Sequence, residues 1–144
     1  MHLVVVTPGG SKVDTQATMV TVPGSVGELG ILPGHRPLIS SLAVGLLSYQ
    51  DGQRTHYIAV NEGFVEVHDD KLAVVTETAE RPDEIDGDRA RKSLEDAEAK
   101  LKSLDAAADP VAWQQANGKR VRALNRIAAL KHATPAALRA QTAG

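Results

Sequence analysis

The spacing of hydrophobic residues changes once along this chain, at Arg81 and Pro82. Before that point, Val and Thr dominate short runs that are interrupted by Gly, Pro and Asp, a pattern typical of β-strands. After it, apolar residues recur at steps of three and four, which indicates helices that bury one face. Strands followed by helices, rather than alternating with them, predict a strand-rich unit and a separate helical unit.

The first part contains several runs of strand composition, and we expect strands at 3–7, 17–22, 46–50, 54–60, 64–68 and 72–76. Asp51-Gly52 and Asp69-Asp70 lie between consecutive runs and are expected to form tight hairpin turns. Pro23-Gly24 is expected to turn the chain after the second run. Many short strands without intervening helices predict an antiparallel sandwich or barrel.

The second part predicts two helices that face one another. The first apolar stripe comprises Ala90, Leu94, Ala97, Leu101 and Leu104. The second comprises Trp113, Ala116, Ala123, Ile127 and Leu130, widened by Val121, Leu124 and Ala128 and interrupted by Arg120. Asp109 is a predicted N-cap, with Pro110 in the first helical turn. Because the connection at 105–109 is short, the helices should form an antiparallel hairpin.

The division predicted from these patterns is a β-sandwich at 1–82, a helical hairpin at 83–133 and a flexible tail at 134–144. Alanine dominates the helical stripes, and alanine buries little area. Two alternatives follow for the hairpin: it can leave its docking site, or it is a permanently packed helical pair.

Composition excludes several classes of function. Cysteine is absent, which removes thiolate catalysis and disulfides, and the five histidines follow no metal-binding spacing. The net charge of −2 does not indicate binding to nucleic acid. No apolar run is long enough to span a bilayer. We find no nucleophile elbow and no phosphate-binding loop, so the pattern favours a binding or regulatory protein over an enzyme.

The segment 24–38 is dense in glycine and proline, which together permit and fix tight turns. Its pieces GELGI at 27–31 and PGHRPL at 33–38 resemble the signature loop of the epsilon subunit of F-type ATP synthases, called delta in mitochondria. The run VNEGFVEV at 60–67 is similar to a hairpin of the same domain, and IDGDRA at 85–90 is similar to the start of the family's helical hairpin.

This resemblance implies a non-catalytic subunit of the central stalk, which couples proton flow through the membrane ring to ATP synthesis. The implied partners are the gamma subunit, the ring of c subunits and, when the hairpin extends, the alpha/beta catalytic head. The complex would hold the chain on the cytoplasmic side of a bacterial cell membrane. The implied contact residues for the ring and gamma are Gly27, Glu28, Leu29, Gly30, His35 and Arg36.

The resemblance also implies that the hairpin inhibits ATP hydrolysis by extending into the catalytic head. The basic residues implied for that contact are Lys119, Arg120, Arg122 and Arg126. Lys131 and Arg139 add to the basic character of this segment. The alternative is an ordinary solvated helix face.

No cofactor is required, but some family members bind ATP on the folded hairpin. The matching positions are Glu80, Asp86, Arg89, Arg122 and Arg126. Arg122 and Arg126 stand four residues apart and can project from one helix face toward one anion. The sequence departs from the family at Asp96, where a further arginine is expected and a carboxylate would repel a triphosphate. The alternative is that Asp86 caps the helix and that Arg89 pairs with Asp86 or Glu95.

A rival hypothesis is a small β-sandwich enzyme or ligand-binding module with a helical appendage. It would need a set of convergent polar groups in a pocket, and the sequence offers no such set. A free-standing helical adaptor is disfavoured because the distinctive segment 24–38 lies in the strand-rich half.

Overall fold

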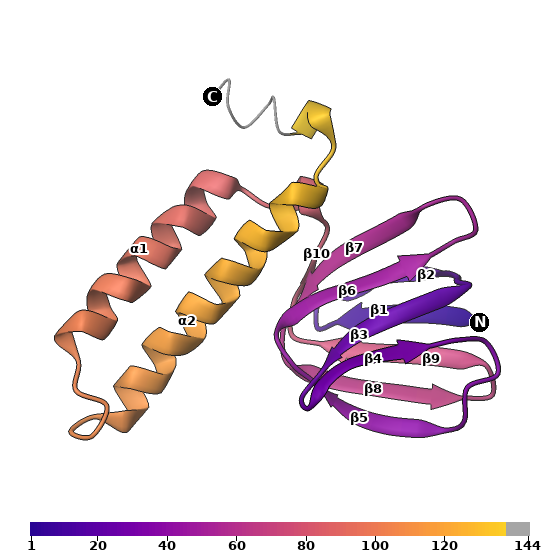
Figure 1. Ribbon diagram of the computed structural model, residues 1–144, viewed down its shortest axis with the longest axis horizontal. Coiled ribbons are helices and arrows are strands. Elements are labelled where there is room, and N and C mark those ends of the chain that lie inside the picture. The colour runs from indigo at the N-terminus through magenta and orange to yellow at the C-terminus, as the bar shows by residue number, and fades with distance from the viewer. Residues whose placement is uncertain (138–144) are drawn as a thin grey trace. The chain divides into compact units, whose positions relative to one another are not determined.

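The computed structural model describes residues 1–137 and divides the chain into two units between Arg81 and Pro82 (Figure 1). The first unit consists of strands and the second of helices, which confirms the predicted fold class. The strands are β1 (His2–Thr7), β2 (Gly10–Gln16), β3 (Met19–Gly24), β4 (Gly27–Ile31), β5 (Leu38–Leu42), β6 (Gly45–Gln50), β7 (Thr55–Val60), β8 (Gly63–His68), β9 (Lys71–Thr76) and β10 (Ala79–Glu80).

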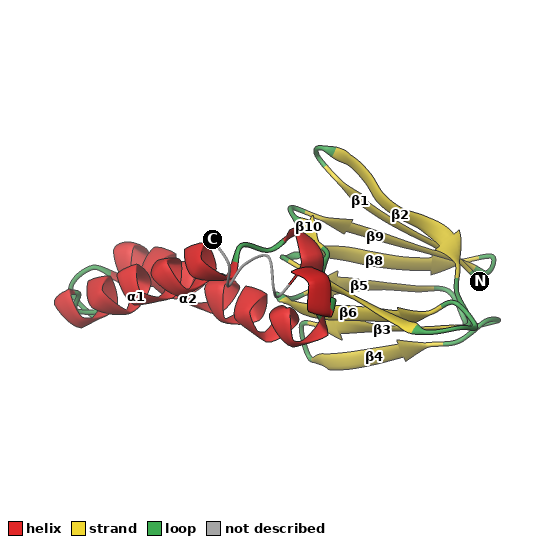
Figure 2. Ribbon diagram, turned by 90° about the horizontal axis from the view of Figure 1, so that it is seen from above, coloured by secondary structure: helices red, strands yellow, loops and turns green. Residues whose placement is uncertain are grey.

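The strands form a sandwich of two layers (Figures 1 and 2). Hydrogen bonding follows the order β10-β7-β6-β3-β5-β8-β9-β1-β2, with β4 paired to β3. The path passes from one layer to the other where β3 meets β5 through the pair Gly24 and Leu42. One layer therefore holds β10, β7, β6, β3 and β4, and the other holds β5, β8, β9, β1 and β2. All neighbours are antiparallel except β1 and β9, which run parallel.

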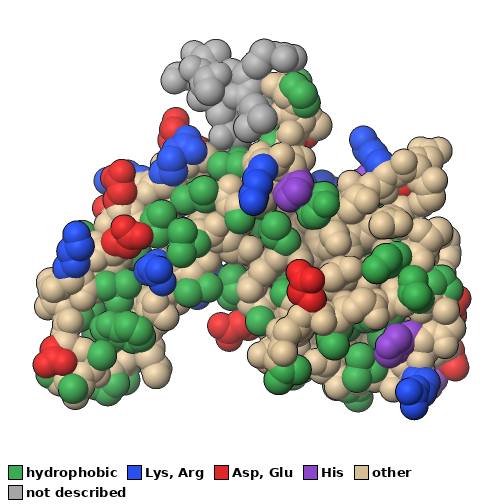
Figure 3. All heavy atoms as spheres, viewed as in Figure 1, with side chains coloured by type: hydrophobic (Ala, Val, Ile, Leu, Met, Phe, Trp, Pro, Cys, Tyr) green, Lys and Arg blue, Asp and Glu red, His purple; other side chains and the backbone are tan. Residues whose placement is uncertain are grey.

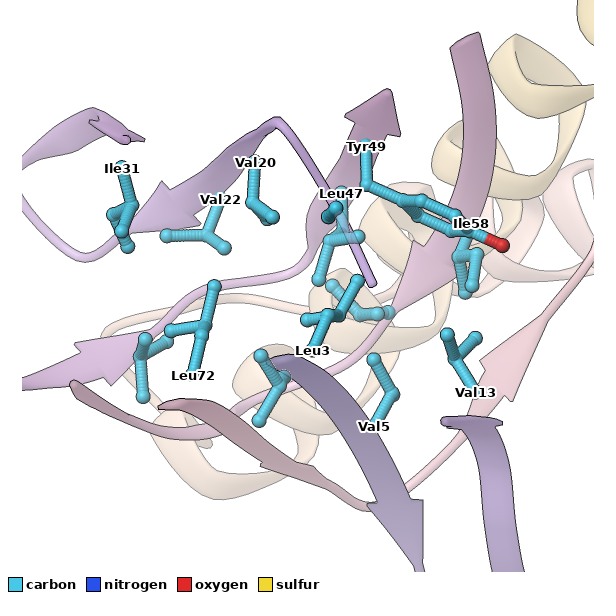
Figure 4. Packing of buried hydrophobic residues seen from close by; sticks show 14 of the residues in the cluster. Leu3, Val5, Val13, Val20, Val22, Ile31, Leu47, Tyr49, Ile58 and Leu72 are labelled. Atoms are coloured by element: carbon cyan, nitrogen blue, oxygen red, sulfur yellow. The ribbon is translucent and has the colours of Figure 1, made fainter. Parts of the chain in front are cut away.

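The core lies between the layers and is built from aliphatic side chains. In Figure 4, Val20, Val22 and Leu47 of one layer point toward Leu3 and Leu72 of the other. These residues are fully buried. Each such side chain stabilises the fold by about 1.5–3 kcal/mol relative to an exposed position. Along strands such as β3 and β9, buried residues alternate with more exposed ones, and the buried set shows which side chains face the core.

Two acidic turns organise neighbouring strands by different means. Asp69 and Asp70 both adopt positive φ angles, 49° and 58°, which confirms the tight turn predicted between β8 and β9. The link between β6 and β7 is longer and is held by the carboxylate of Asp51. The Asp51 carboxylate accepts hydrogen bonds from the His56 ring and from the backbone N–H groups of Arg54 and Gln53. The bond from His56 has the largest effect on the pKa of Asp51. These bonds hold the pKa of the Asp51 carboxyl well below its usual range.

Several strand predictions are wrong in detail. The chain does not turn at Pro23-Gly24, because β3 continues through Gly24 and the turn lies at Ser25 and Val26. Thr18 was expected beside Val20 on a strand face but is exposed in a bend. Strands β2, β4, β5 and β10 have no counterpart among the predicted runs.

The resemblance at 60–67 also requires a correction, because β7 and β8 do not pair and form no hairpin. β7 pairs with β6 and β10, whereas β8 pairs with β5 and β9, so Asn61 and Glu62 link the two layers. The link ends at Gly63, where an added Cβ would lie 1.8 Å from the carbonyl oxygen of Val75. This close approach of β9 requires glycine at that position.

The second unit contains helix α1 (Gly87–Ser103) and helix α2 (Pro110–Ala129), which run antiparallel (Figure 1). The side chain of Asp86 caps α1, and that of Asp109 caps α2 with Pro110 in the first turn, as predicted for α2. The buried positions of the two helices are Gly87 and five alanines, namely Ala90, Ala97, Ala116, Ala123 and Ala129. Leu104 lies outside α1 as its C-cap residue, and Val121 and Leu124 are exposed rather than part of the packed stripe.

Short 3-10 turns flank the hairpin at Pro82–Glu84 and Leu130–His132. The carboxylate of Asp83 accepts hydrogen bonds from the backbone N–H and the hydroxyl of Thr134, at 2.8 and 3.1 Å. These bonds join the two ends of the helical unit. Of the tail predicted at 134–144, the part from residue 138 onward, including Arg139, lies outside the described residues.

Candidate functional site

The distinctive segment 24–38 is not one irregular loop, because its middle forms strand β4 (Gly27–Ile31). β4 pairs with β3, and it has no strand on its other side among residues 1–137. An edge strand presents unpaired backbone N–H and C=O groups to a neighbour. At 3.3 Å per residue, β4 offers an edge about 16 Å long.

A tight turn follows β4, and its residues match the requirements of a type II turn. The backbone N–H of His35 donates to the carbonyl of Leu32 at 3.1 Å, which closes the turn. Pro33 occupies the second position, and Gly34 occupies the third with φ +81°. Type II turns favour proline and glycine at these two positions. Pro33 and Gly34 therefore shape this turn.

A side chain from a distant hairpin holds this turn in place. The carboxylate Oδ1 of Asp70 accepts a hydrogen bond from the backbone N–H of Gly34 at 3.0 Å. Asp70 belongs to the turn between β8 and β9, 36 residues further along the chain. A hydrogen bond to a carboxylate is stronger than one between neutral groups. Sequence reasoning missed Asp70 because the turn signal alone accounts for an aspartate there.

The structure distributes the predicted ring-contact residues along β4 and the turn that follows it. Gly27 and Glu28 stand at the start of β4, and His35 and Arg36 follow its far end. Glu28, His35 and Arg36 are exposed, and the His35 ring bonds to the carbonyl of Arg36 at 2.7 Å. Leu29 is different, because its side chain is half-buried and packs against the core.

A second candidate site lies within the helical unit, in a hollow between α1 and α2. Its volume is about 430 Å³. The charged side chains that line it are Asp96, Lys100, Lys119, Arg122 and Arg126. Four cations and one carboxylate make the hollow electropositive, and such a site suits an anion. Lys100 and Lys119 were not among the predicted ATP ligands.

The predicted ATP-binding residues do not all meet in this hollow. Arg122 and Arg126 line it, whereas Asp86 and Arg89 lie at the start of α1 outside its lining. Asp86 caps α1 by accepting a hydrogen bond from the backbone N–H of Arg89 at 3.2 Å. Within residues 1–137, Arg89 forms no ion pair with Asp86 or Glu95. Glu80 belongs to β10 in the strand unit.

Asp96, the position that departs from the family pattern, has a cationic neighbour. Its carboxylate lies 3.7 Å from the ammonium of Lys92, one helical turn earlier in α1. Both side chains are exposed, so the pair contributes only about 0.3–0.5 kcal/mol. The pairing nevertheless offsets part of the negative charge that Asp96 brings to the hollow.

Helix α2 carries only basic charges along its length. Lys119, Arg120, Arg122 and Arg126 lie on it, and it contains no Asp or Glu. Lys119 is exposed, and Arg120 is half-buried. Figure 3 shows charged side chains of both signs over the helical unit, with hydrophobic side chains between them.

We expect substitution of Asp70 to loosen the turn at 32–35. In Asp70→Gly the positive φ is tolerated but the acceptor is lost, whereas Asp70→Asn keeps both the tolerance and an oxygen acceptor. The Gly34 amide should therefore exchange with deuterium at least about tenfold faster in Asp70→Gly than in Asp70→Asn, measured by NMR. Equal exchange in the two variants would show that Asp70 does not hold the turn.

Neither helix among the described residues combines the length and hydropathy needed to cross a bilayer. Within the same residues, no cluster of three or more His, Cys, Asp or Glu side chains is arranged to hold a metal ion.

Comparison with known proteins identifies relatives that cover most of the chain. Residues 1–82 match the family model for the β-sandwich domain of the ATP synthase delta/epsilon chain. ATP synthase epsilon chain 2 of Syntrophotalea carbinolica is 44% identical over 107 residues, covering 74% of this chain and 78% of the relative. The epsilon chain of Nitratidesulfovibrio vulgaris is 42% identical over 116 residues, covering 81% and 87%.

A solved structure supports the same grouping. One chain of the Euglena gracilis mitochondrial ATP synthase, solved with its c-ring, superposes with a TM-score of 0.72 at 26% identity, covering 90% of this chain and 78% of that one. The resemblance noted in the sequence is thereby confirmed. With its β-sandwich, its edge strand β4 and its helical hairpin, the chain belongs to the ATP synthase delta/epsilon chain family.

Proposed function

We propose that the chain is a non-catalytic central-stalk subunit of an F-type ATP synthase, which couples proton flow through the membrane ring to ATP synthesis. The observation that carries this proposal is the exposed edge of β4 and the turn that Asp70 fixes beside it. The gamma subunit and the c ring are the proposed neighbours, and the complex holds the chain on the cytoplasmic side of a bacterial membrane.

The ring contact proposed here runs along β4 rather than at a single loop. Glu28 at one end and His35 and Arg36 at the other are exposed. Gly27 and Gly30 leave the backbone accessible between these side chains. An acid on this edge can pair with a basic polar loop of the ring, contributing about 0–1 kcal/mol.

We expect Glu28→Lys to weaken assembly of the chain with the ring and gamma by about three- to tenfold, because charge reversal replaces attraction with repulsion. Affinity for the synthase stripped of this subunit is the quantity to measure. Glu62→Lys, which reverses an exposed acid in the link between β7 and β8, is the matched control. Equal affinities for both variants and the unmodified chain would remove Glu28 from the interface.

We further propose that the hairpin restrains ATP hydrolysis by extending toward the catalytic head. The support is the wholly basic charge of α2 together with its alanine-rich packing against α1. Alanine contacts bury little area, so separation from a docked position costs little free energy. The basic residues Lys119, Arg120, Arg122 and Arg126 would then meet acidic residues of the head.

Reversing two of these charges tests the inhibitory contact. We expect Lys119→Glu combined with Arg120→Glu to raise ATP hydrolysis by the assembled synthase at least about threefold, because like charges would oppose docking on an acidic surface. Lys102→Glu, at the exposed end of α1, is the control and should leave hydrolysis unchanged. Circular dichroism must show that the helices remain folded. Unchanged hydrolysis in the folded double variant would contradict an inhibitory role for this face.

We also propose that the folded hairpin binds ATP as a regulatory ligand. The proposal is supported by the electropositive hollow to which Arg122 and Arg126 contribute. Asp86, Arg89 and Glu80 are the remaining ligands that the family pattern suggests. Arg122 and Arg126 cannot bind ATP and contact the catalytic head at the same time. Bound ATP would therefore favour the compact hairpin.

Calorimetric titration of the full chain with MgATP tests this ligand. We expect saturable heat that is lost in Arg122→Ala, because that change removes a guanidinium group from the hollow. Lys102→Ala removes a cation outside the hollow and should bind as the unmodified chain does. Absence of heat at millimolar MgATP would overturn the proposal.

A further inference from the structure

Helix α2 contains a glycine, Gly118, in its interior. Glycine inside a helix is less favourable than alanine, because glycine loses more backbone freedom on folding. Such a position keeps glycine at a cost to helix stability unless the backbone angles or the missing side chain are needed there. The surroundings of Gly118 show which of these requirements applies.

Two common reasons for a glycine do not apply to Gly118. Its φ angle is not positive, so the backbone conformation does not require glycine. Close packing of α1 is not the reason either, because the three atoms nearest to a Cβ added at Gly118 all belong to Arg122 of α2 itself. Alanine would therefore suit the helix conformation and would not collide with α1.

The space beside Gly118 is occupied by the guanidinium group of Arg122, which follows four residues later in α2. An added Cβ would lie 3.2 Å from Nη1 and 3.8 Å from both Cζ and Nη2 of Arg122. The shortest of these distances is below the usual contact distance, so the guanidinium would have to move away. Side chains on a helix point toward its N-terminus, which brings residue i+4 over residue i. The missing side chain at 118 thus allows the guanidinium of Arg122 to lie close to the helix.

Arg122 lines the hollow between the helices and has no partner among the described residues. The residue is half-buried. Within 1–137, no hydrogen bond or ion pair joins its side chain to another residue. Its N–H donors are therefore left for water or for a ligand in the hollow. Lys100, Lys119 and Arg126 line the same hollow, so an anionic ligand would meet several positive charges.

We propose that Gly118 is a positioning residue of this anion site, an inference that rests on the ATP binding proposed above. Without a side chain at 118, the flat guanidinium of Arg122 keeps the place from which it can meet two oxygens of a phosphate group. A group that is already in place loses less freedom when the ligand binds. The glycine lies outside the set of residues that the family resemblance suggested, and it exchanges helix stability for the geometry of the site.

Calorimetric titration of the full chain with MgATP, together with thermal unfolding followed by circular dichroism, tests this exchange. Gly118→Ala should raise the temperature at which the helices unfold, because alanine is the better helix former. The same variant should raise the Kd for MgATP at least about threefold, because the methyl group displaces the guanidinium. Gly118→Leu fills more of this space and should raise the Kd at least about tenfold.

Asn117→Ala is the matched control. It also replaces a residue of α2 with a better helix former, but residue 117 does not line the hollow. Its Kd for MgATP should therefore differ from that of the unmodified chain by less than about twofold.

An NMR measurement on the chain without ligand separates positioning from a general effect on the helix. In Gly118→Ala, the Nε–Hε signal of Arg122 should shift more than that of Arg126, which lines the same hollow further along α2. Equal or smaller movement of the Arg122 signal would show that position 118 does not set the orientation of this guanidinium.

The outcomes separate this inference from the ATP-binding proposal. If the unmodified chain gives no heat with MgATP, the ATP-binding proposal itself fails, and the inference fails with it. If the unmodified chain binds and Gly118→Ala binds equally well, ATP binding stands and Gly118 is not a positioning residue. If Gly118→Ala lowers both the unfolding temperature and the affinity, the glycine is needed for packing of the helices, and the positioning role is wrong.

Discussion

The aliphatic core between the two strand layers is the constraint on which every proposed surface depends. Leu3, Val20, Val22, Leu47 and Leu72 meet there, and their burial fixes which residues of each strand face outward. A slip of one residue in any strand would exchange its inner and outer faces. The same core packing that holds Ile31 inside leaves the outer edge of β4 free. Stability and the presentation of contact surfaces therefore have a single cause.

The helical unit is held by a weaker kind of packing. Its buried positions are mainly alanines, whereas the strand unit buries Val, Leu and Ile. The helix caps at Asp86 and Asp109 keep each helix intact whether or not the two pack together. This difference suits a protein with one rigid part and one part that changes position. It also supports the proposal that the basic residues of α2 bind an anion within the folded hairpin and, in another state, contact the catalytic head.

Local signals in the sequence predicted much of this architecture. The Asp69-Asp70 turn and the Asp109 cap were predictable because each depends on residues within a few positions. Strand β4 was missed because its glycines resemble a loop, and only pairing with β3 makes it a strand. Pro23 was expected to turn the chain, but β3 tolerates it. At such positions, pairing with a neighbouring strand outweighs the local conformational preference of the residue.

The candidate sites, like the fold, could be predicted from the sequence only in part. The residues proposed for the ring contact were identified through their resemblance to a family motif, but their distribution along an edge strand could not be predicted. The hydrogen bond from Gly34 to Asp70 depends on strand order and register. Sequence spacing carries no information about contacts between distant segments.

The central claim, that the β4 edge rests on the rotor ring, can be tested directly because the chain contains no cysteine. A single cysteine introduced as Glu28→Cys can be oxidised in the assembled synthase against cysteines placed in the polar loop of the c subunit. The account predicts a disulfide-linked product for Glu28→Cys and none for Gln53→Cys, which lies in the turn between β6 and β7. A product from Gln53→Cys with none from Glu28→Cys would contradict it.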